Sequence, residues 1–193
     1  YNGKPLGSIG HLGCLSFHET KNIISGQGGA LLINDASLVD RAEIIRENGT
    51  NHTQFSQGQV DKYTWCDVGS NYLPGEMVAA FLWAQMEDAQ NITRQRLDIW
   101  ERYHTMLAKL ESEGHIKRPF MPENCEHNAH MYYIILSAEI DRKYVLDEFY
   151  RNNIVSVFHY VPLHSSPAGK RYGKIHGEMV NTDSLSSRII RLP

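Results

Sequence analysis

One segment of the sequence combines a lysine with hydroxyl side chains and a pair of glycines. Ser16 and Thr20 precede Lys21, and Gly28-Gly29 follow it. A lysine that is partly desolvated at the end of a buried strand has a lowered pKa, so more of its amine is neutral and nucleophilic at pH 7. Schiff-base chemistry requires such a neutral amine. The hydroxyls could hold an oxyanion such as phosphate, and the glycines permit a tight turn and close backbone approach. The alternative for Lys21 is an ordinary solvated lysine in a surface loop.

A second segment places two histidines and a tyrosine close together. His159 and Tyr160 follow an apolar run that suits a strand, and His164 comes shortly afterwards. Histidine nitrogens and a tyrosine hydroxyl can hydrogen-bond a polar substrate, with a pair of surface histidines on a loop as the alternative. A zinc site is not indicated, because the ten histidines are scattered and neither Cys-x-x-Cys nor His-Glu-x-x-His spacing occurs.

The elements around the lysine are predicted to be a strand, a loop, a second strand and a helix. Residues 9–17 are small and apolar and suit a buried strand, whereas residues 18–29 are polar and glycine-rich and suit a loop. The short apolar run at residues 30–33 suits the second strand. Asp35 is suited to cap a helix over residues 36–47 rather than to act as a base.

A long loop and a long helix are predicted next. Residues 48–70 are rich in Gln, Gly, Thr and Asn, and a loop of this length is usually functional or contacts a partner. Pro74 suits the first turn of a helix, and a helical pattern continues to about residue 113 with a bend or break near residues 87–91. The positions expected to face inward are Met77, Phe81, Ala84, Ile92, Leu97, Trp100, Tyr103, Leu107 and Leu110.

Beyond residue 114 the pattern alternates between strands and helices. Residues 131–136 and 154–158 are predicted strands, residues 142–152 are a predicted helix, and a further helix is predicted to start within residues 184–190. This alternation predicts a small α/β layer packed on its own sheet. We place the domain boundary inside the long helix, near Arg94.

The composition excludes several classes of protein. A hydrophobic fraction of 41% and a charged fraction of 21% are ordinary for a globular protein. The formal net charge of −3 and the lack of a Lys/Arg-rich run argue against nucleic-acid binding. The apolar runs are too short to span a bilayer, and no secretory leader is recognisable. Three widely spaced cysteines fit reduced thiols, so we expect a cytoplasmic protein. Both ends resemble cut ends, so we expect the chain to be part of a longer polypeptide.

Several motifs, taken in order, resemble those of the DegT/DnrJ/EryC1/StrS sugar aminotransferases. The lysine segment is similar to that family's cofactor-lysine segment and reads Ser16-Phe17-His18-Glu19-Thr20-Lys21-Asn22, then Gly26-Gln27-Gly28-Gly29-Ala30. The later matches are Arg46-Glu47-Asn48-Gly49, Gly69-Ser70-Asn71-Tyr72-Leu73, Ala79-Ala80 with Gln85-Met86, His159-Tyr160-Val161-Pro162-Leu163-His164, and Arg191-Leu192-Pro193. Residues 57–65 and 159–165 are most similar to the branch that makes dTDP-4-amino-4,6-dideoxygalactose.

The resemblance implies a role for each of these site residues. Lys21 would form the Schiff base with pyridoxal 5'-phosphate (PLP), and Ser16 would bind the cofactor phosphate. Asn71 would reach the phosphate of the neighbouring subunit's cofactor, because the family builds its site across a homodimer interface. The alternative for Asn71 is a turn residue before a helix. His159, Tyr160 and His164 would contact the sugar nucleotide.

The resemblance also implies a fold and a reaction. The fold is α/β, of the fold-type I aminotransferase class, with residues 1–93 as the C-terminal part of the PLP-binding large domain and residues 94–193 as the small domain. Glutamate would donate its amino group to a nucleotide-linked 4-keto-6-deoxy sugar, with dTDP-4-keto-6-deoxy-glucose becoming dTDP-4-amino-4,6-dideoxygalactose. A lysine at position 21, rather than a histidine, argues against the family's dehydratase relatives.

The sequence departs from the family pattern in what precedes the lysine. The family's aspartate that pairs with the pyridine nitrogen, the glutamine near the ring oxygen and a phosphate-binding turn all lie upstream by a stretch that this chain lacks. The aspartate keeps the ring an electron sink, so we expect this chain alone to turn over feebly. Three alternatives stay open: the same transamination on another keto-sugar nucleotide, a non-catalytic sugar-nucleotide-binding or regulatory relative, and a dimerisation module built on the helix of residues 74–113.

Overall fold

The chain forms two compact units of mixed α/β structure. The computed structural model describes all residues from Tyr1 to Pro193. Unit 1 consists of residues 1–93 with residues 123–126, and unit 2 of residues 94–122 with residues 127–193. Helix α4 (Ala89–Met106) begins in unit 1 and continues into unit 2. None of the helices combines the length and the apolar character needed to cross a bilayer.

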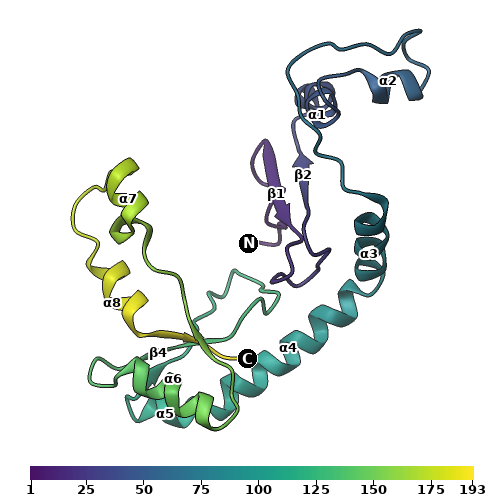
Figure 1. Ribbon diagram of the computed structural model, residues 1–193. Helices are drawn as coiled ribbons and strands as arrows, with labels where there is room; N and C mark the ends of the chain where they lie inside the picture. The colour runs from purple at the N-terminus through teal and green to yellow at the C-terminus, as the bar shows by residue number, and fades with distance from the viewer. The chain divides into compact units, whose positions relative to one another are not determined.

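Unit 1 is built around an antiparallel hairpin. Strands β1 (Leu12–Ser16) and β2 (Gly29–Ile33) pair along their whole length, with Ser16 opposite Gly29 (Figure 1). The two strands and the loop between them are confirmed, but the expected burial of β1 is wrong for this chain. Leu15 and Leu31 are 41% and 48% exposed. The reason is that the two strands make extensive contacts only with each other, so no other element of the chain covers the face that carries these leucines.

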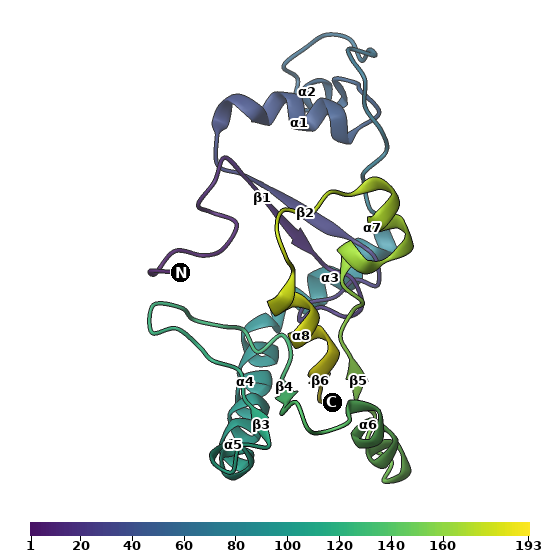
Figure 2. The same ribbon diagram turned by 90° about the vertical axis from the view of Figure 1, so that its left-hand side faces the viewer.

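Asp35 caps the next helix, as expected. Its carboxylate accepts a hydrogen bond from the backbone N–H of Ser37 at 2.9 Å. The first turn is a 3-10 turn, η1 (Ala36–Leu38), and α1 (Val39–Arg46) follows. The helix ends because Asn48 and Gly49 both take positive φ angles, 59° and 76°. The long loop that follows contains a short helix, α2 (His52–Ser56), which lies beside α1 (Figure 2).

The predicted long helix is three helices. α3 (Glu76–Glu87) ends at Asp88, where the break was expected, and α4 is followed by α5 (Ala108–Ser112). Trp100 of α4 is buried, as predicted. The inward orientation expected for α3 is wrong, because Met77 is 86% exposed and Phe81 is 51% exposed. The expected inward Leu110 is exposed as well.

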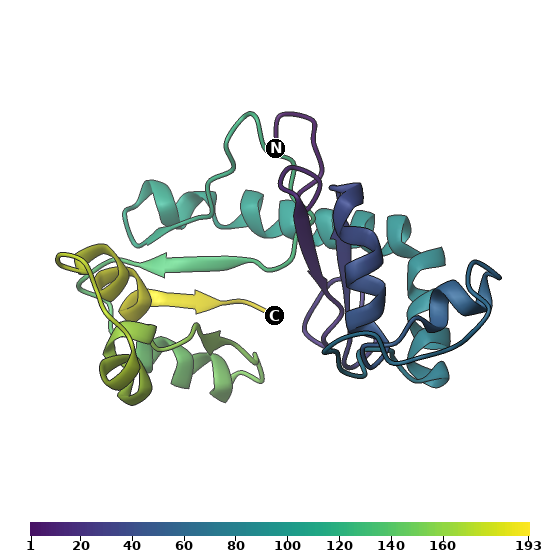
Figure 3. The same cartoon turned by 90° about the horizontal axis from the view of Figure 1, so that it is seen from above.

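Unit 2 contains a four-stranded antiparallel sheet in the order β3-β4-β6-β5. The strands are β3 (Ile116–Lys117), β4 (Tyr133–Leu136), β5 (Val157–Phe158) and β6 (Ile189–Arg191). Figure 3 shows β4 and β6 side by side. The helices outside this sheet are α6 (Arg142–Arg151), η2 (Leu163–Ser165), α7 (Pro167–Tyr172) and α8 (Val180–Arg188).

The helix expected within residues 184–190 is confirmed, but its bounds are wrong. α8 begins earlier, at Val180, and ends at Arg188. Ile189 to Arg191 form an inner strand because they pair with β4 on one side and β5 on the other. β-branched isoleucines suit such a position.

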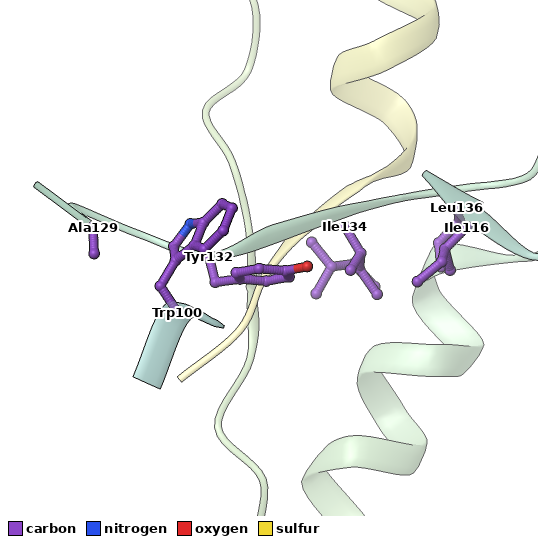
Figure 4. Packing of buried hydrophobic residues seen from close by; sticks show 7 residues of the cluster. Trp100, Ile116, Ala129, Tyr132, Ile134 and Leu136 are labelled. Atoms are coloured by element: carbon purple, nitrogen blue, oxygen red, sulfur yellow. The ribbon is translucent and has the colours of Figure 1, made fainter. Parts of the chain in front are cut away.

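One face of this sheet carries the core of unit 2. Ile190 is fully buried at 0% exposure, and Trp100 packs edge-on to Tyr132 with ring centroids 5.3 Å apart (Figure 4). The buried cluster is Trp100, Ile116, Ala129, Tyr132, Ile134, Leu136 and Ile190. Burial raises the pKa of Tyr132 to about 12, so its phenol stays neutral at physiological pH.

Candidate active site

The loop that carries Lys21 is an ordered continuation of the hairpin. Beyond the strands, Phe17 donates its backbone N–H to Gly28 at 2.9 Å, and Ser25 donates to the carbonyl of Phe17 at 2.7 Å. The hydroxyl of Ser25 donates to Gln27 at 3.0 Å. A Cβ at position 28 would lie 2.6 Å from that hydroxyl oxygen, so a larger residue there would displace the Ser25 hydroxyl from Gln27.

His18 fixes the approach to Lys21, a role that the sequence reasoning missed. Its Nδ1 accepts the backbone N–H of Thr20 at 3.3 Å and lies 3.1 Å from the Thr20 hydroxyl oxygen. Because Nδ1 accepts a backbone N–H, it carries no proton, and the Thr20 hydroxyl donates to it. The backbone N–H of Lys21 donates to the carbonyl of His18 at 2.9 Å. Thr20, expected as an oxyanion ligand, is therefore engaged by His18.

Lys21 is exposed, and its amine has no hydrogen-bond or ion-pair partner in the chain. The expectation that residues of this chain desolvate the amine is therefore wrong. The physical reason is the same as for β1, since the loop extends from a two-stranded sheet that has no covering layer. A solvated lysine, the alternative weighed from sequence, describes Lys21 in this chain.

The polar groups near the lysine segment suit an aldehyde phosphate. The Oγ of Ser16 accepts a long hydrogen bond of 3.5 Å from the N–H of His18, which leaves the hydroxyl hydrogen of Ser16 available to donate. A primary amine on the same ordered loop is also unengaged. These residues fit PLP, whose phosphate needs donors and whose carbonyl carbon needs an amine.

Asn71 lies at the end of the long loop and pairs through its backbone with Glu47. Its Oδ1 accepts the backbone N–H of Leu73 at 3.3 Å, which is the turn role considered as its alternative. The side-chain NH₂ group remains available as a donor. Asn71 therefore combines a defined backbone position with a free pair of amide hydrogens.

Two glycines allow the chain to cross where Asn71 is positioned. Gly49 has a φ angle of 76°, and a Cβ there would lie 1.7 Å from the carbonyl oxygen of Asp67. A Cβ on Gly69 would lie 2.1 Å from the backbone nitrogen of Gly49. No larger residue fits either position without moving the backbone, so the two motif glycines set the approach of residues 69–71 to the end of α1.

Glu47 holds the same region by hydrogen bonds and was not recognised from sequence. The residue is buried, and its carboxylate accepts from Nδ1 of His52 at 2.8 Å and from Arg46 at 2.9 Å. Thr53 adds a third hydrogen bond at 3.3 Å. Burial acts to raise the pKa of Glu47, but the hydrogen bonds from His52 and Arg46 outweigh it and hold the pKa below its usual value. A glutamate just before an Asn-Gly helix end was the available signal.

The three residues expected to contact substrate lie in unit 2. His159 and Tyr160 follow β5, and their rings meet edge-on with centroids 5.0 Å apart. His164 lies in η2, where its Nε2 is 2.8 Å from a carboxylate oxygen of Asp183 on α8 and only 13% of its side chain is exposed. The His164–Asp183 contact thus fixes the segment after β5 against α8.

Two hollows in unit 2 contain none of the predicted site residues. One is lined by residues of α6, β5 and α8 and by the segment before α6. The other is lined by residues of α4, by residues 129–132 just before β4 and by the C-terminal segment. No group of three or more His, Cys, Asp or Glu side chains could hold a metal ion. The three cysteines are free.

Comparison with known proteins decides the family. The profile of the DegT/DnrJ/EryC1/StrS aminotransferase family matches residues 1–193. The chain belongs to this family. It is 28% identical over 195 residues to the GDP-perosamine synthase of Vibrio cholerae, covering 100% of the chain and 50% of that protein. It is 22% identical to the UDP-4-amino-4,6-dideoxy-N-acetyl-beta-L-altrosamine transaminase of Helicobacter pylori, covering 97% of the chain and 46% of that protein.

Solved structures agree with the family membership. A DegT/DnrJ/EryC1/StrS aminotransferase from Brucella abortus superposes with a TM-score of 0.79 at 28% identity, covering 97% of the chain and 46% of that structure. The fold is therefore that of the α/β sugar aminotransferases. The chain spans about half the length of the relatives it matches.

The lowered pKa of Glu47 leads to a pH-dependent prediction. A carboxyl whose pKa is lower in the folded state stabilises the fold above its unfolded pKa, and the contribution is lost as pH falls through the folded value. We expect Glu47→Gln to lower the free energy of unfolding by about 1–3 kcal/mol at pH 7. The difference from wild type should shrink below the ordinary carboxyl pKa of 4.5.

Urea unfolding followed at pH 7 and at acid pH measures both values. Glu19→Gln is the matched control, because Glu19 is exposed and should leave the free energy of unfolding unchanged. An equal loss for Glu47→Gln at both pH values would contradict the assigned ion pairing.

Proposed function

We propose that this chain carries the lysine and the sugar-side residues of a PLP-dependent aminotransferase that acts on a nucleotide-linked keto sugar. The observation that carries the proposal is the unengaged amine of Lys21, presented by an ordered loop in a chain whose whole length matches the family. The named relatives support the reaction class, since several are called transaminases or aminotransferases of nucleotide sugars.

The residues of the chain would divide the work as follows. Lys21 would hold PLP covalently, and its free amine would carry the proton during amino transfer because it stays next to the reacting carbon. The Ser16 hydroxyl would donate a hydrogen bond to the phosphate of the same cofactor. In a homodimer, the Asn71 side-chain NH₂ would donate to the phosphate of the cofactor bound by the partner subunit. PLP supplies a ring that accepts electron density when the amino donor loses its proton.

Desolvation of Lys21 would come from residues beyond those of this chain. The matched relatives are about twice as long, and in the family the aspartate partner of the pyridine nitrogen precedes the lysine. A two-stranded ribbon whose leucines are half exposed offers a surface for such a covering layer. We therefore expect the chain by itself to be nearly inactive. We also propose that the complete enzyme is cytoplasmic.

The finer proposal is that glutamate aminates dTDP-4-keto-6-deoxy-glucose to dTDP-4-amino-4,6-dideoxygalactose. Support comes from residues 57–65 and 159–165, which resemble that branch. His159, Tyr160 and His164 would contact the sugar nucleotide. The relatives named above act on sugars carried by GDP or UDP, and a further one is named for a dTDP sugar, so the same chemistry on another nucleotide is the first alternative.

A second candidate function is non-catalytic regulation. The pleiotropic regulatory protein of Geobacillus stearothermophilus is 26% identical to the chain and is covered to 49% of its length. A full-length protein without the upstream aspartate would favour this function. The exposed apolar side chains of α3 also fit a module that only dimerises, whose sign would be a stable oligomer with no affinity for PLP.

Colour tests the cofactor assignment. We expect the full-length protein to be yellow after purification, with an absorbance that borohydride abolishes, and Lys21→Ala to be colourless. Lys62→Ala is the matched control, because Lys62 is also an exposed loop lysine, and it should stay yellow. A wild-type protein that never takes up added PLP would rule out the aminotransferase.

Product mass tests the substrate. The full-length enzyme is supplied with glutamate and a panel of keto-sugar nucleotides that differ in base and sugar. We expect an amino-sugar product by mass spectrometry from the dTDP-4-keto-6-deoxy sugar at the highest kcat/KM. A higher kcat/KM on a GDP- or UDP-linked sugar would replace the dTDP assignment while leaving the reaction class intact.

A further inference from the structure

Arg191 carries a buried donor that nothing in the chain satisfies. It is the last residue of β6, where it lies opposite Tyr133 of β4 and Val157 of β5. Its Nε is shielded from solvent and has no hydrogen-bond partner, and no carboxylate of the chain forms an ion pair with its guanidinium. Buried polar groups are almost always hydrogen-bonded, so the unpartnered Nε of Arg191 is unusual.

Strand geometry places Arg191 on the face of the sheet opposite to the core of unit 2. Side chains alternate between the two faces of a strand, so Arg191 is on the face opposite to Ile190. Ile190 belongs to the core face and is fully buried. Arg191 is therefore directed away from the apolar cluster of unit 2, toward the face that it shares with Tyr133 and Val157.

His159 supplies a second unsatisfied nitrogen at the same place. Its Nδ1 is also buried without a partner. Tyr160 contacts both groups, since its ring is 5.0 Å from the His159 ring and 5.7 Å from the guanidinium carbon of Arg191. The third unpartnered atom, the Oγ of Ser156, lies just before β5, where alternation directs it to the opposite face from Val157. It is not part of this group.

We propose that Arg191, with His159 beside it, is a subsite for a substrate oxyanion. A guanidinium presents parallel N–H donors that match two oxygens of a carboxylate or phosphate. The inference rests on the proposed function for the identity of the anion. The two sources available to that reaction are a carboxylate of the glutamate donor and the diphosphate of the sugar nucleotide. Arg191 is then a specificity-determining residue for one of these substrates.

The test uses the full-length protein and two probes that cannot react. Glutarate represents the dicarboxylate donor, and thymidine diphosphate represents the nucleotide. We expect Arg191→Gln to weaken binding of one probe about tenfold or more by calorimetry, because charge-assisted hydrogen bonds are lost, and Arg191→Lys to weaken it less. The corresponding KM, for glutamate or for the keto-sugar nucleotide, should rise with it. If the variant loses affinity for glutarate, Arg191 binds a carboxylate of the amino donor. If it loses affinity for thymidine diphosphate, Arg191 binds the diphosphate of the sugar nucleotide.

Arg171→Gln is the matched control. Arg171 also lies over a tyrosine, 4.9 Å from the ring of Tyr172, so it repeats the cation–π contact on a helix elsewhere in unit 2. It should change neither affinity. Unchanged affinity for both probes in a folded Arg191→Gln variant would overturn the subsite, and so would an equal loss in Arg171→Gln.

Folding and function are separated by two further readings. If Arg191→Gln does not fold, the affinities of His159→Asn and Arg191→Lys for both probes are measured instead. Wild-type affinity of both variants for both probes would overturn the proposal. A yellow wild-type protein whose variants bind normally would refute the subsite alone. A colourless wild type that binds a probe through Arg191 would refute the aminotransferase and leave the subsite standing.

Discussion

The site depends on a lysine that is held by backbone hydrogen bonds and left unpaired at its amine. The β1–β2 hairpin fixes where the loop starts and ends, and hydrogen bonds from Phe17 and Ser25 continue the pairing toward its tip. His18 then fixes the conformation just before Lys21. No carboxylate of the chain forms an ion pair with the Lys21 amine. An ordered loop with an unengaged nucleophile is what covalent attachment of a carbonyl cofactor requires.

The second part of unit 1 is positioned by two independent constraints. Gly49 and Gly69 permit a backbone crossing that side chains would block. Glu47 ties the end of α1 to α2 by two hydrogen bonds, from His52 and Thr53, and accepts a third from Arg46 of α1 itself. Gly69 lies two residues before Asn71, and Gly49 lies two residues after Glu47, the residue that pairs with Asn71 through its backbone. The backbone around Asn71 is therefore fixed by residues of the chain itself.

Local sequence patterns predicted much of the secondary structure, but they did not predict which side chains are buried. The hairpin, the Asp35 cap, the break at Asp88 and the strand at Tyr133–Leu136 are signals carried by neighbouring residues. Burial of Leu15 or Met77 depends on a covering layer, and apolar spacing cannot say whether that layer belongs to the same chain. Ile189 and Ile190 were assigned to the preceding helix because a strand of three residues is too short to separate a helical from a strand period.

The candidate site was predictable in its residue types and not in their contacts. Motif order pointed to Ser16, Lys21 and Asn71, whereas the roles of His18 and Glu47 depend on loop conformations that no spacing rule encodes. Arg191 was noticed only as part of a motif, since its unsatisfied nitrogen becomes visible once the strand alternation is known. Side chains that position others are therefore the ones that sequence reasoning missed.

The central claim is that one amine of this chain, and no other, forms the covalent link. Peptide mapping after borohydride reduction of the full-length protein with PLP measures this directly by mass spectrometry. The account predicts the reduced cofactor on the peptide that contains Lys21. A modification found on another lysine, with the Lys21 peptide unchanged, would contradict it.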